Sequence, residues 1–269
     1  MDDLRLEGKV VLITGGSSGL GQNAAVAFAM QGAYLSLTGR SEDGLAMSKR
    51  KCIDAGLPAD KIFTIAGDIT NMDDCKQISD ETAKYFGKID VLVNNAGVVA
   101  TGEFEKTPVE KVKSVFETNV KGTFHMTKTT LPWLLATKGN IVNVSSFTAQ
   151  RPVNDYFAYC LSKSALDQMT KNLALELGPV GIRVNVVNPG IMRDTNLWSR
   201  PGMPLYKMPI FGGFILKKIG PMYPLGRGSL SDEVVPAILF LSSDTCSSFI
   251  TGHSLMIDGG KALTSEQAF

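Results

Sequence analysis

Seven short apolar runs recur along the chain, and segments with helical spacing of their apolar residues separate most of them. The runs lie at residues 10–13, 33–38, 62–66, 89–93, 140–144, 182–187 and 255–257, and the helical segments at 20–30, 43–55, 72–86, 109–136, 156–177 and 231–242. Alternation of strand and helix predicts right-handed crossovers and a parallel sheet covered on both faces. Continuous apolar runs suit strands that are buried on both sides. We therefore expect an α/β fold, a doubly wound parallel sheet of about seven strands, in a single domain spanning residues 1–269.

The charges of the chain nearly cancel, with 27 Lys and Arg against 26 Asp and Glu. This balance gives no electrostatic reason to expect nucleic acid or an acidic membrane surface as a partner. The start of the chain mixes acids and bases, and no apolar run approaches the roughly 18 residues that a membrane helix needs. The 4 cysteines are widely spaced and lack a CxxC pair, which favours free thiols in a reducing compartment over a metal site. We expect a cytoplasmic protein without a bound metal.

A glycine-rich segment, Thr-Gly-Gly-Ser-Ser-Gly-Leu-Gly at residues 14–21, joins the first expected strand to the helix after it. Its glycines permit a tight turn and a close approach of the backbone to a pyrophosphate. The start of the following helix offers free N–H groups and the positive end of its dipole. Ligands of open parallel sheets bind beyond the carboxyl ends of the strands. The segment therefore predicts a nucleotide site, although a glycine-rich turn without a ligand has the same pattern.

Tyr159 and Lys163 stand four residues apart in the helix expected at 156–177, so their side chains share one face. A nearby ammonium favours the phenolate and should lower the tyrosine pKa from about 10 toward neutrality. A phenol tuned in this way can give a proton to a carbonyl oxygen or take one from an alcohol. Ser145 and Ser146 end the fifth expected strand, where a hydroxyl can hydrogen-bond the reacting oxygen or simply cap a turn.

Taken together, these segments resemble the short-chain dehydrogenase/reductase family over roughly residues 6–263. Ser146 precedes Tyr159 by 13 residues, the spacing that the family commonly shows, and this selects Ser146 over Ser145. The resemblance implies a Rossmann-type fold and a homotetramer. It rests on the glycine-rich turn, on Tyr159 with Lys163, and on Asp68 after the third strand, Asn94-Asn95-Ala96-Gly97, Asn119 in Thr-Asn-Val-Lys-Gly, Pro189-Gly190, and Thr251-Gly252 with Asp258-Gly259-Gly260. The amides of residues 94–97 have a structural alternative, a turn that braces neighbouring strands.

The resemblance also implies a catalytic tetrad. Tyr159 is the acid/base, Lys163 lowers its pKa and binds the nicotinamide ribose, Ser146 steadies the substrate oxygen, and Asn119 holds a water in a proton relay. The family usually has a threonine at the position of Asp194, so either the loop shifts by one residue or that contact is lost. The implied cofactor contacts, besides Tyr159 and Lys163, are Gly15, Ser17, Ser18, Gly19, Leu20, Gly21, Asp68, Ile69, Asn95, Ala96, Gly97, Pro189, Gly190, Ile191 and Thr195.

The end of the second expected strand indicates which dinucleotide binds. An acid at this position accepts hydrogen bonds from the adenosine ribose and repels a 2′-phosphate, but here the position is Gly39. Arg40 follows, whose guanidinium can pair with a phosphate and stack on adenine, and Ser41 can add a hydroxyl. The alternative is that Arg40 pairs with Glu42 or Asp43. The sequence therefore predicts NADP(H).

Residues 191–227 break the alternation, because they are rich in proline and glycine and have no clean period. Loops of this length are usually lids or binding loops, the alternative being a poorly ordered insertion. The loop's apolar side chains favour a hydrophobic or cyclic carbonyl substrate over a free sugar, and its lysines leave room for an acidic group on that substrate. The alternative role for the apolar side chains is contact between subunits. The apolar residues are Trp198, Met203, Leu205, Met208, Ile210, Phe211, Phe214, Ile215 and Leu216, and the lysines are Lys207, Lys217 and Lys218.

These observations predict an NADP(H)-dependent oxidoreductase that transfers a hydride between nicotinamide and a carbonyl or secondary alcohol. His125 and His253 follow no nucleophile elbow, so a hydrolase triad is not supported. The alternative from another class is a catalytically silent nucleotide-binding scaffold or regulatory protein of the same fold. A scaffold is expected to lose part of the tetrad, whereas this chain retains all of it, which favours the enzyme.

Overall fold

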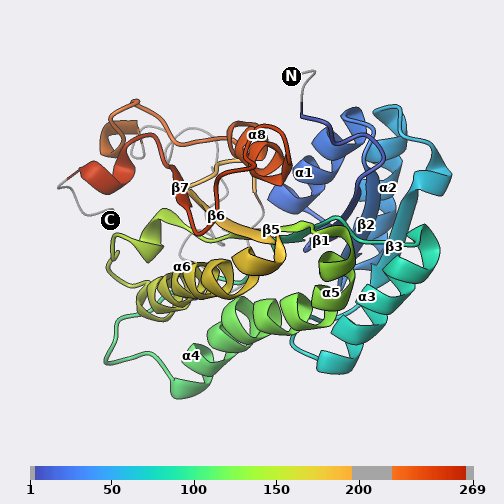
Figure 1. Cartoon of the computed structure of the whole chain (residues 1–269). Helices are drawn as coiled ribbons and strands as arrows, with labels where there is room; N and C mark the ends of the chain where they lie inside the picture. Colours follow the sequence, from blue (N-terminus) through green and yellow to red (C-terminus); the bar gives the residue numbers. More distant parts are fainter. Residues whose placement is uncertain (1–3, 196–219, 265–269) are drawn as a thin grey trace.

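A seven-stranded sheet runs through the molecule in the order β3-β2-β1-β4-β5-β6-β7, and every neighbouring pair is parallel (Figure 1). The structure is a computed structural model that describes residues 4–195 and 220–264. The strands are β1 (Val10–Thr14), β2 (Tyr34–Gly39), β3 (Ile62–Ala66), β4 (Val91–Asn94), β5 (Asn140–Val144), β6 (Arg183–Pro189) and β7 (Ser254–Ile257). The predicted doubly wound parallel sheet is confirmed. Its order reverses between β1 and β4, and ligands of such sheets bind in the crevice at that point.

Helices cover both faces of the sheet (Figure 1). One face carries α1 (Gly19–Met30), α2 (Glu42–Asp54) and α8 (Ser231–Ser242), and the other carries α3 (Met72–Phe86), α4 (Val109–Phe116), α5 (Thr123–Thr137) and α6 (Phe157–Leu177). A hydrophobic core lies under each layer, one around Phe28 and Ile238 and the other around Ile78 and Met126. The short helical turns are η1 (Ala59–Lys61), η2 (Glu117–Gly122), η3 (Phe147–Ala149), η4 (Gly178–Val180), η6 (Gly220–Met222) and η7 (Lys261–Leu263).

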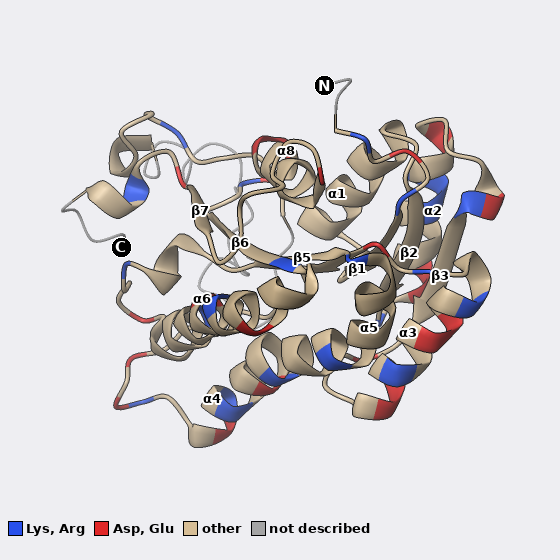
Figure 2. Cartoon of the chain, in the orientation of Figure 1, with Lys and Arg blue, Asp and Glu red and all other residues tan. Residues whose placement is uncertain are grey.

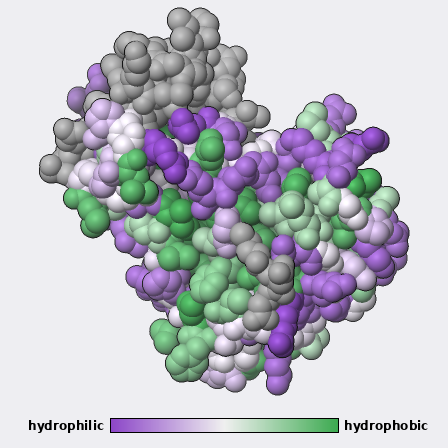
Figure 3. All heavy atoms as spheres, turned by 90° about the horizontal axis from the view of Figure 1, so that it is seen from above, coloured by the Kyte–Doolittle hydropathy of each residue, from purple (hydrophilic) through white to green (hydrophobic). Residues whose placement is uncertain are grey.

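Helix α3 shows how the sequence pattern produces these layers. Asn71 caps its start by accepting hydrogen bonds from the N–H groups of Asp73 and Asp74, at 2.8 and 3.3 Å. Gly87 ends it in the left-handed region, with a φ of 80°. Ile78 faces the core, whereas charged residues of both signs lie on the outer faces of the helices (Figure 2). Hydrophilic side chains also cover much of the face seen in Figure 3, with hydrophobic ones in smaller patches.

The helix predicted over residues 109–136 is wound differently in its middle. It consists of α4, the π-helical turn η2 and then α5. The turn contains Asn119, which is buried and hydrogen-bonds the Val98 backbone through both the oxygen and the nitrogen of its side-chain amide. Oδ1 accepts from the Val98 N–H at 2.8 Å, and Nδ2 donates to the Val98 carbonyl at 2.9 Å. Such π-helical turns are rare and frequently mark functional sites.

The loop predicted at residues 191–227 is described only at its ends, 191–195 and 220–227. The apolar side chains from Trp198 to Leu216, and the three lysines beside them, lie outside the described residues. Within the described ranges, no helix is long and apolar enough to cross a membrane. The same ranges hold no cluster of His, Cys, Asp and Glu side chains suited to a metal ion.

Candidate active site

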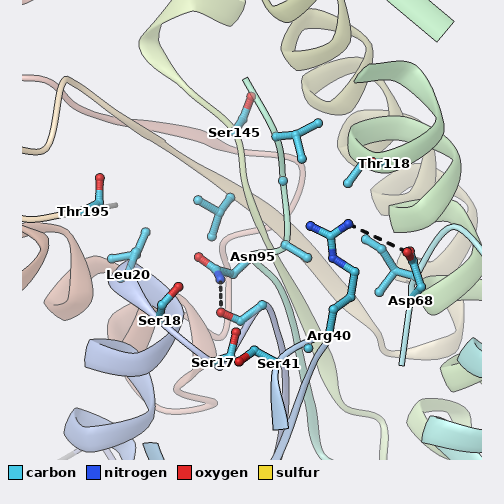
Figure 4. Close-up of a pocket in the computed structure, with 18 of the residues that line it drawn as sticks. Ser17, Ser18, Leu20, Arg40, Ser41, Asp68, Asn95, Thr118, Ser145 and Thr195 are labelled. Carbon is cyan, nitrogen blue, oxygen red and sulfur yellow. Dashed lines mark hydrogen bonds and ion pairs between the residues drawn. The ribbon is translucent and has the colours of Figure 1, made fainter. Parts of the chain in front are cut away.

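A cavity of about 340 Å³ opens at the carboxyl ends of the central strands (Figure 4). This volume suits a small-molecule site, which usually measures roughly 300–1,000 Å³. The walls come from the turn between β1 and α1, from the segments that follow β2, β3, β4, β5 and β6, and from α6. The lining residues are Gly15, Ser17, Ser18, Gly19, Leu20, Gly39, Arg40, Ser41, Gly67, Asp68, Ile69, Asn95, Ala96, Gly97, Val98, Thr118, Val144, Ser145, Tyr159, Lys163, Met192 and Thr195.

Four of the predicted cofactor residues do not line this cavity: Gly21, Pro189, Gly190 and Ile191. Gly21 acts through packing, because a Cβ there would lie 2.5 Å from the carbonyl oxygen of Gly15. Its lack of a side chain allows α1 to start directly against the turn. Ile191 donates its backbone N–H to the Tyr223 hydroxyl at 2.8 Å. This bond holds the start of the loop after β6 against the segment that contains Tyr223.

Sequence motifs miss several residues that line the cavity: Gly67, Val98, Thr118, Val144 and Met192. Gly67 follows the end of β3 and Val98 follows the end of β4. Their place in the strand–helix alternation could have found these two, because ligands bind beyond strand ends. Thr118 belongs to the π-helical turn and Met192 to the loop after β6. Their positions depend on irregular segments that periodicity does not predict.

The start of α1 is suited to an anion. Ser18 is the N-cap of α1, and its side chain makes no capping hydrogen bond. The first N–H groups of any α-helix lack intrahelical partners, and here Ser17, Ser18 and Gly19 form part of the cavity wall. Gly15 has a φ of 66°, and a Cβ on it would lie 2.9 Å from the Cα of Ala96, so glycine is required there. These residues fit the pyrophosphate of a dinucleotide.

Asn95 and Ala96 brace the glycine-rich turn as well as line the cavity. The Thr14 hydroxyl accepts hydrogen bonds from both of their N–H groups at 3.0 Å. Asn95 Nδ2 donates to the carbonyl of Thr14 at 2.9 Å and to that of Gly15 at 3.3 Å, the second of which is drawn in Figure 4. Asn94 is buried and donates to a side chain on β5 at 3.0 Å. The amides of Asn94 and Asn95 therefore also brace neighbouring segments, as the structural alternative predicts.

Tyr159 and Ser146 are buried next to each other. Tyr159 lies in the first turn of α6, and Ser146 follows β5 and caps η3 by accepting from the Thr148 N–H at 3.2 Å. The side chain of Ser146 lies close enough to the Tyr159 hydroxyl to act on its pKa through a hydrogen bond. Ser145 bonds elsewhere, because its hydroxyl donates to the backbone carbonyl of Lys163 at 3.1 Å. The structure thus places Ser146, and not Ser145, against the tyrosine.

Lys163 is buried one helical turn after Tyr159, with Nζ 5.6 Å from the centre of the tyrosine ring. Nζ donates to the carbonyl of Val144 at 2.9 Å. Burial raises the pKa of Tyr159, opposed by the hydrogen bond from Ser146, and burial lowers the pKa of Lys163 to about 8. The structure does not show the predicted lowering of the tyrosine pKa, because burial raises it, and the contribution of Lys163 to that pKa stays a prediction. A tyrosine that holds its proton suits donation to a carbonyl oxygen.

Asn119 approaches Lys163 across Gly97. A Cβ on Gly97 would lie 3.3 Å from Asn119 Oδ1 and 3.6 Å from Lys163 Nζ. Asn119 also donates from Nδ2 to the Ser162 hydroxyl at 3.0 Å, which fixes its amide against α6. The structure therefore brings the predicted tetrad together, but only Tyr159 and Lys163 of the four line the cavity. The water relay assigned to Asn119 stays a prediction.

Asp194 and Thr195 have separate roles. The Asp194 carboxylate accepts from the Ser231 N–H at 2.9 and 3.1 Å and from the Ser231 hydroxyl, so it caps α8. Thr195 lines the cavity close to Gly19, because a Cβ added to Gly19 would lie 3.7 Å from the Cβ of Thr195. Of the two alternatives for this loop, the geometry supports the shift by one residue.

We expect Asp194→Ala to lower the free energy of unfolding by about 1 kcal/mol, the typical cost of a lost helix cap. Denaturant unfolding followed by circular dichroism measures this change. Asp194→Asn is the matched control, because its amide oxygen can still accept from the Ser231 N–H. An Asp194→Ala variant as stable as the parent would contradict the capping role.

Arg40 reaches into the cavity from the end of β2 (Figure 4). Its Nη1 lies 4.0 Å from Asp68 Oδ2, and the Arg40 side chain is largely exposed whereas that of Asp68 is partly exposed. In the described part of the chain its ion-pair partner is thus Asp68, rather than Glu42 or Asp43 as in the alternative interpretation. Ser41 lines the cavity and caps α2 by accepting from a first-turn N–H at 3.1 Å. The guanidinium is therefore accessible to an anion.

Comparison with known proteins supplies the family. A family model described as enoyl-(acyl carrier protein) reductase matches residues 15–262. A 3-oxoacyl-[acyl-carrier-protein] reductase of Thermotoga maritima is 35% identical over 258 residues, covering 96% of this chain and 99% of that protein. The chain belongs to the short-chain dehydrogenase/reductase family.

Solved structures of short-chain dehydrogenases/reductases share its fold. One of unknown function from Caenorhabditis elegans, with cofactor, has a TM-score of 0.89 and 35% identity and covers 97% of both chains. A 3-ketoacyl-(acyl-carrier-protein) reductase from Brucella melitensis, complexed with NADH, has a TM-score of 0.84 and 32% identity and covers 96% of this chain and 99% of that one. As a member of this family, the protein is an oxidoreductase that uses a nicotinamide cofactor to transfer a hydride to or from alcohol and carbonyl groups of small molecules.

Proposed function

We propose that this short-chain dehydrogenase/reductase depends on NADP(H) and interconverts a hydrophobic or cyclic ketone and its secondary alcohol. The observation that carries the proposal is the contact between Ser146 and Tyr159 beside a cavity that Lys163 also lines. This contact places a proton donor and a second hydroxyl where one carbonyl oxygen can meet both.

The residues of the site divide the reaction as follows. The bound nicotinamide supplies or accepts the hydride. In ketone reduction, the Tyr159 hydroxyl gives its proton to the carbonyl oxygen, which Ser146 orients through a hydrogen bond. Lys163 stabilises the phenolate that remains on Tyr159, and Asn119 belongs to the relay that returns a proton from solvent. In alcohol oxidation the same phenolate takes the proton from the substrate.

Arg40 supports NADP(H) as the cofactor. The residue before it, Gly39, has no side chain to repel a 2′-phosphate, and the guanidinium lies in the cavity wall. Its ion pair with Asp68 is long and exposed, and such pairs contribute about 0–1 kcal/mol. A phosphate can therefore replace Asp68 as the partner of Arg40 at little cost.

The apolar surroundings of Ser146 and Tyr159 favour a hydrophobic substrate. One buried cluster follows Ser146 and reaches the loop after β6, and the other contains Tyr159 itself. Of these residues only Tyr159 lines the cavity, and the others are apolar packing around the catalytic residues, an environment that suits an apolar ligand. The first cluster consists of Phe147, Ile191, Met222 and Tyr223, and the second of Tyr156, Tyr159 and Cys160.

A panel of ketones, aldehydes, diketones and polyols tests this function, with oxidation of NADPH as the readout. We expect turnover of medium-sized hydrophobic or cyclic ketones and little turnover of polyols. No turnover across the panel, with NADPH still bound, would instead indicate a nucleotide-binding scaffold. A clear preference for small polyols would overturn the substrate class alone.

We also propose a homotetramer. Helices α5 and α6 expose apolar side chains on their outer faces, namely Phe124, Leu135, Phe157 and Leu161. Exposed apolar faces of this kind pair across two-fold axes. Light scattering at micromolar concentration is expected to give the mass of four chains, and the mass of a monomer would contradict this assembly.

We place the enzyme in the cytoplasm. None of its four cysteines, all of which lie in the described residues, forms a disulfide, and burial raises the pKa of the Cys52 and Cys75 thiols to about 12. Thiols that stay protonated in a core are inert and suit a reducing compartment. The partners expected there are the dinucleotide and a small-molecule substrate.

A further inference from the structure

Asp167 is a buried acid behind the catalytic residues. It lies in α6, one helical turn after Lys163 and on the same face. Its Oδ2 accepts hydrogen bonds from Asn188 Nδ2 and from the Ser254 hydroxyl, both at 2.9 Å. Because Asn188 belongs to β6 and Ser254 begins β7, this one oxygen joins α6 to two neighbouring strands.

The amide of Asn188 extends this connection to the site. Besides its bond to Asp167, Nδ2 donates to the backbone carbonyl of Ser146 at 3.1 Å. A chain of two hydrogen bonds therefore runs from the carboxylate to the serine that contacts Tyr159. An amide held at both of its hydrogens cannot rotate without breaking one bond, so Asp167 determines where the Ser146 carbonyl is held.

The charge of Asp167 also acts on Lys163. Oδ1 of Asp167 is buried with no hydrogen-bond partner among the described residues. Burial of a carboxylate is costly unless a cation compensates it, and the carboxylate acts to raise the pKa of Lys163 against the larger effect of burial. Among the described residues, the groups of other elements that the structure places near Lys163 Nζ are the Val144 carbonyl from β5 and the Asn119 amide from η2, and both are uncharged.

We propose that Asp167 is a positioning residue for the reaction, which holds Ser146 in place through Asn188 and places a negative charge one helical turn after Lys163, behind Tyr159. The proposal rests on the function assigned above to Tyr159 and Lys163. It predicts that loss of the carboxylate changes the protonation of Lys163, whereas loss of a single hydrogen bond to that carboxylate does not.

Titration of the lysine side chains by carbon-13 NMR tests this prediction without a substrate. The Lys163 signal is assigned by its absence in Lys163→Met. In the parent, Lys163 is expected to titrate with a pKa of about 8. In Asp167→Asn the pKa of Lys163 should fall by roughly one unit, because the carboxylate that favours the ammonium is gone. The same pKa in both proteins would overturn the proposal.

Two matched variants separate charge from structure. Ser254→Ala removes one hydrogen bond to Asp167 but keeps the charge, so the Lys163 titration should stay at the parent value. Asp167→Glu retains the charge and should restore the parent titration at least in part. If Asp167→Asn does not fold, Asp167→Ser removes the charge with a smaller side chain and takes its place. A downward shift in Ser254→Ala as large as in Asp167→Asn would show a merely structural role and contradict the proposal.

The pH profile of alcohol oxidation supplies the catalytic readout. In Asp167→Asn, Lys163 should lose its proton at a lower pH than it does in the parent. The phenolate of Tyr159 then lacks its stabilising cation, so the acid limb of kcat/KM should move to higher pH. An unmoved limb in an active variant would refute the catalytic consequence. If the parent turns over no substrate, the proposed function fails, and the NMR titration still decides whether Asp167 acts on Lys163.

Discussion

Tyr159→Phe is expected to lower kcat/KM for ketone reduction by about 10²–10⁴-fold, the usual contribution of a general acid, and to leave the Kd of NADPH close to the parent value. The substitution removes only the hydroxyl that Ser146 contacts. The buried ring keeps its packing against Tyr156 and Cys160, so the fold and the cavity should remain. Steady-state rates and the fluorescence of bound NADPH measure the two quantities.

Tyr156→Phe is the matched control. It makes the same chemical change at a buried tyrosine three residues earlier, outside the cavity lining. We expect this variant to retain most of the parent activity. If instead Tyr159→Phe retained most of its activity, the proton would come from another group and the proposed mechanism would be wrong.

The second large effect concerns the cofactor. The parent is expected to prefer NADPH over NADH by about ten- to hundredfold in kcat/KM, because a charged phosphate–guanidinium hydrogen bond contributes roughly 1.5–3 kcal/mol. Gly39→Asp combined with Arg40→Leu should reverse the preference. The new carboxylate accepts from the ribose hydroxyls and repels the 2′-phosphate, and the cation that paired with the phosphate is lost. Catalytic efficiency with each cofactor is measured for both proteins.

The double variant needs a control for crowding, because a side chain at position 39 has little room. A Cβ on Gly39 would lie 3.0 Å from the Ser17 hydroxyl, so Ser17 must move slightly in the double variant. Gly39→Ala introduces the same crowding without charge, and it should lose efficiency equally with both cofactors. A parent that prefers NADH would contradict the assignment to NADP(H).

The sheet and the nucleotide turn follow from local patterns in the sequence. The apolar side chains of β1 and β5 predict strands by themselves. The glycine-rich turn likewise predicts a left-handed φ, which Gly15 has. The spacing of Tyr159 and Lys163 likewise predicts a shared helix face from a few residues. Features that depend on neighbours in sequence could therefore be predicted.

Other parts of the site depend on contacts between distant segments. Asp194 caps a helix that begins 37 residues later, and the π-helical turn is held by the bonds of Asn119 to Val98. The pKa of Tyr159 is raised because the fold excludes water from it, which the distance to Lys163 along the chain does not reveal. Burial of this kind is a property of the assembled core, so its effect on the pKa of Tyr159 could not be predicted from the sequence.

Hydride transfer itself is the most direct test of the proposed activity. NADPH carrying deuterium on the transferred position of C4 is incubated with the parent enzyme and the best ketone of the panel, and the alcohol product is analysed by mass spectrometry. The proposed function predicts deuterium on the carbinol carbon of the product from the parent enzyme and almost no product from Tyr159→Phe. Unlabelled ketone recovered in full from the parent, across the whole panel and with NADPH bound, would contradict it.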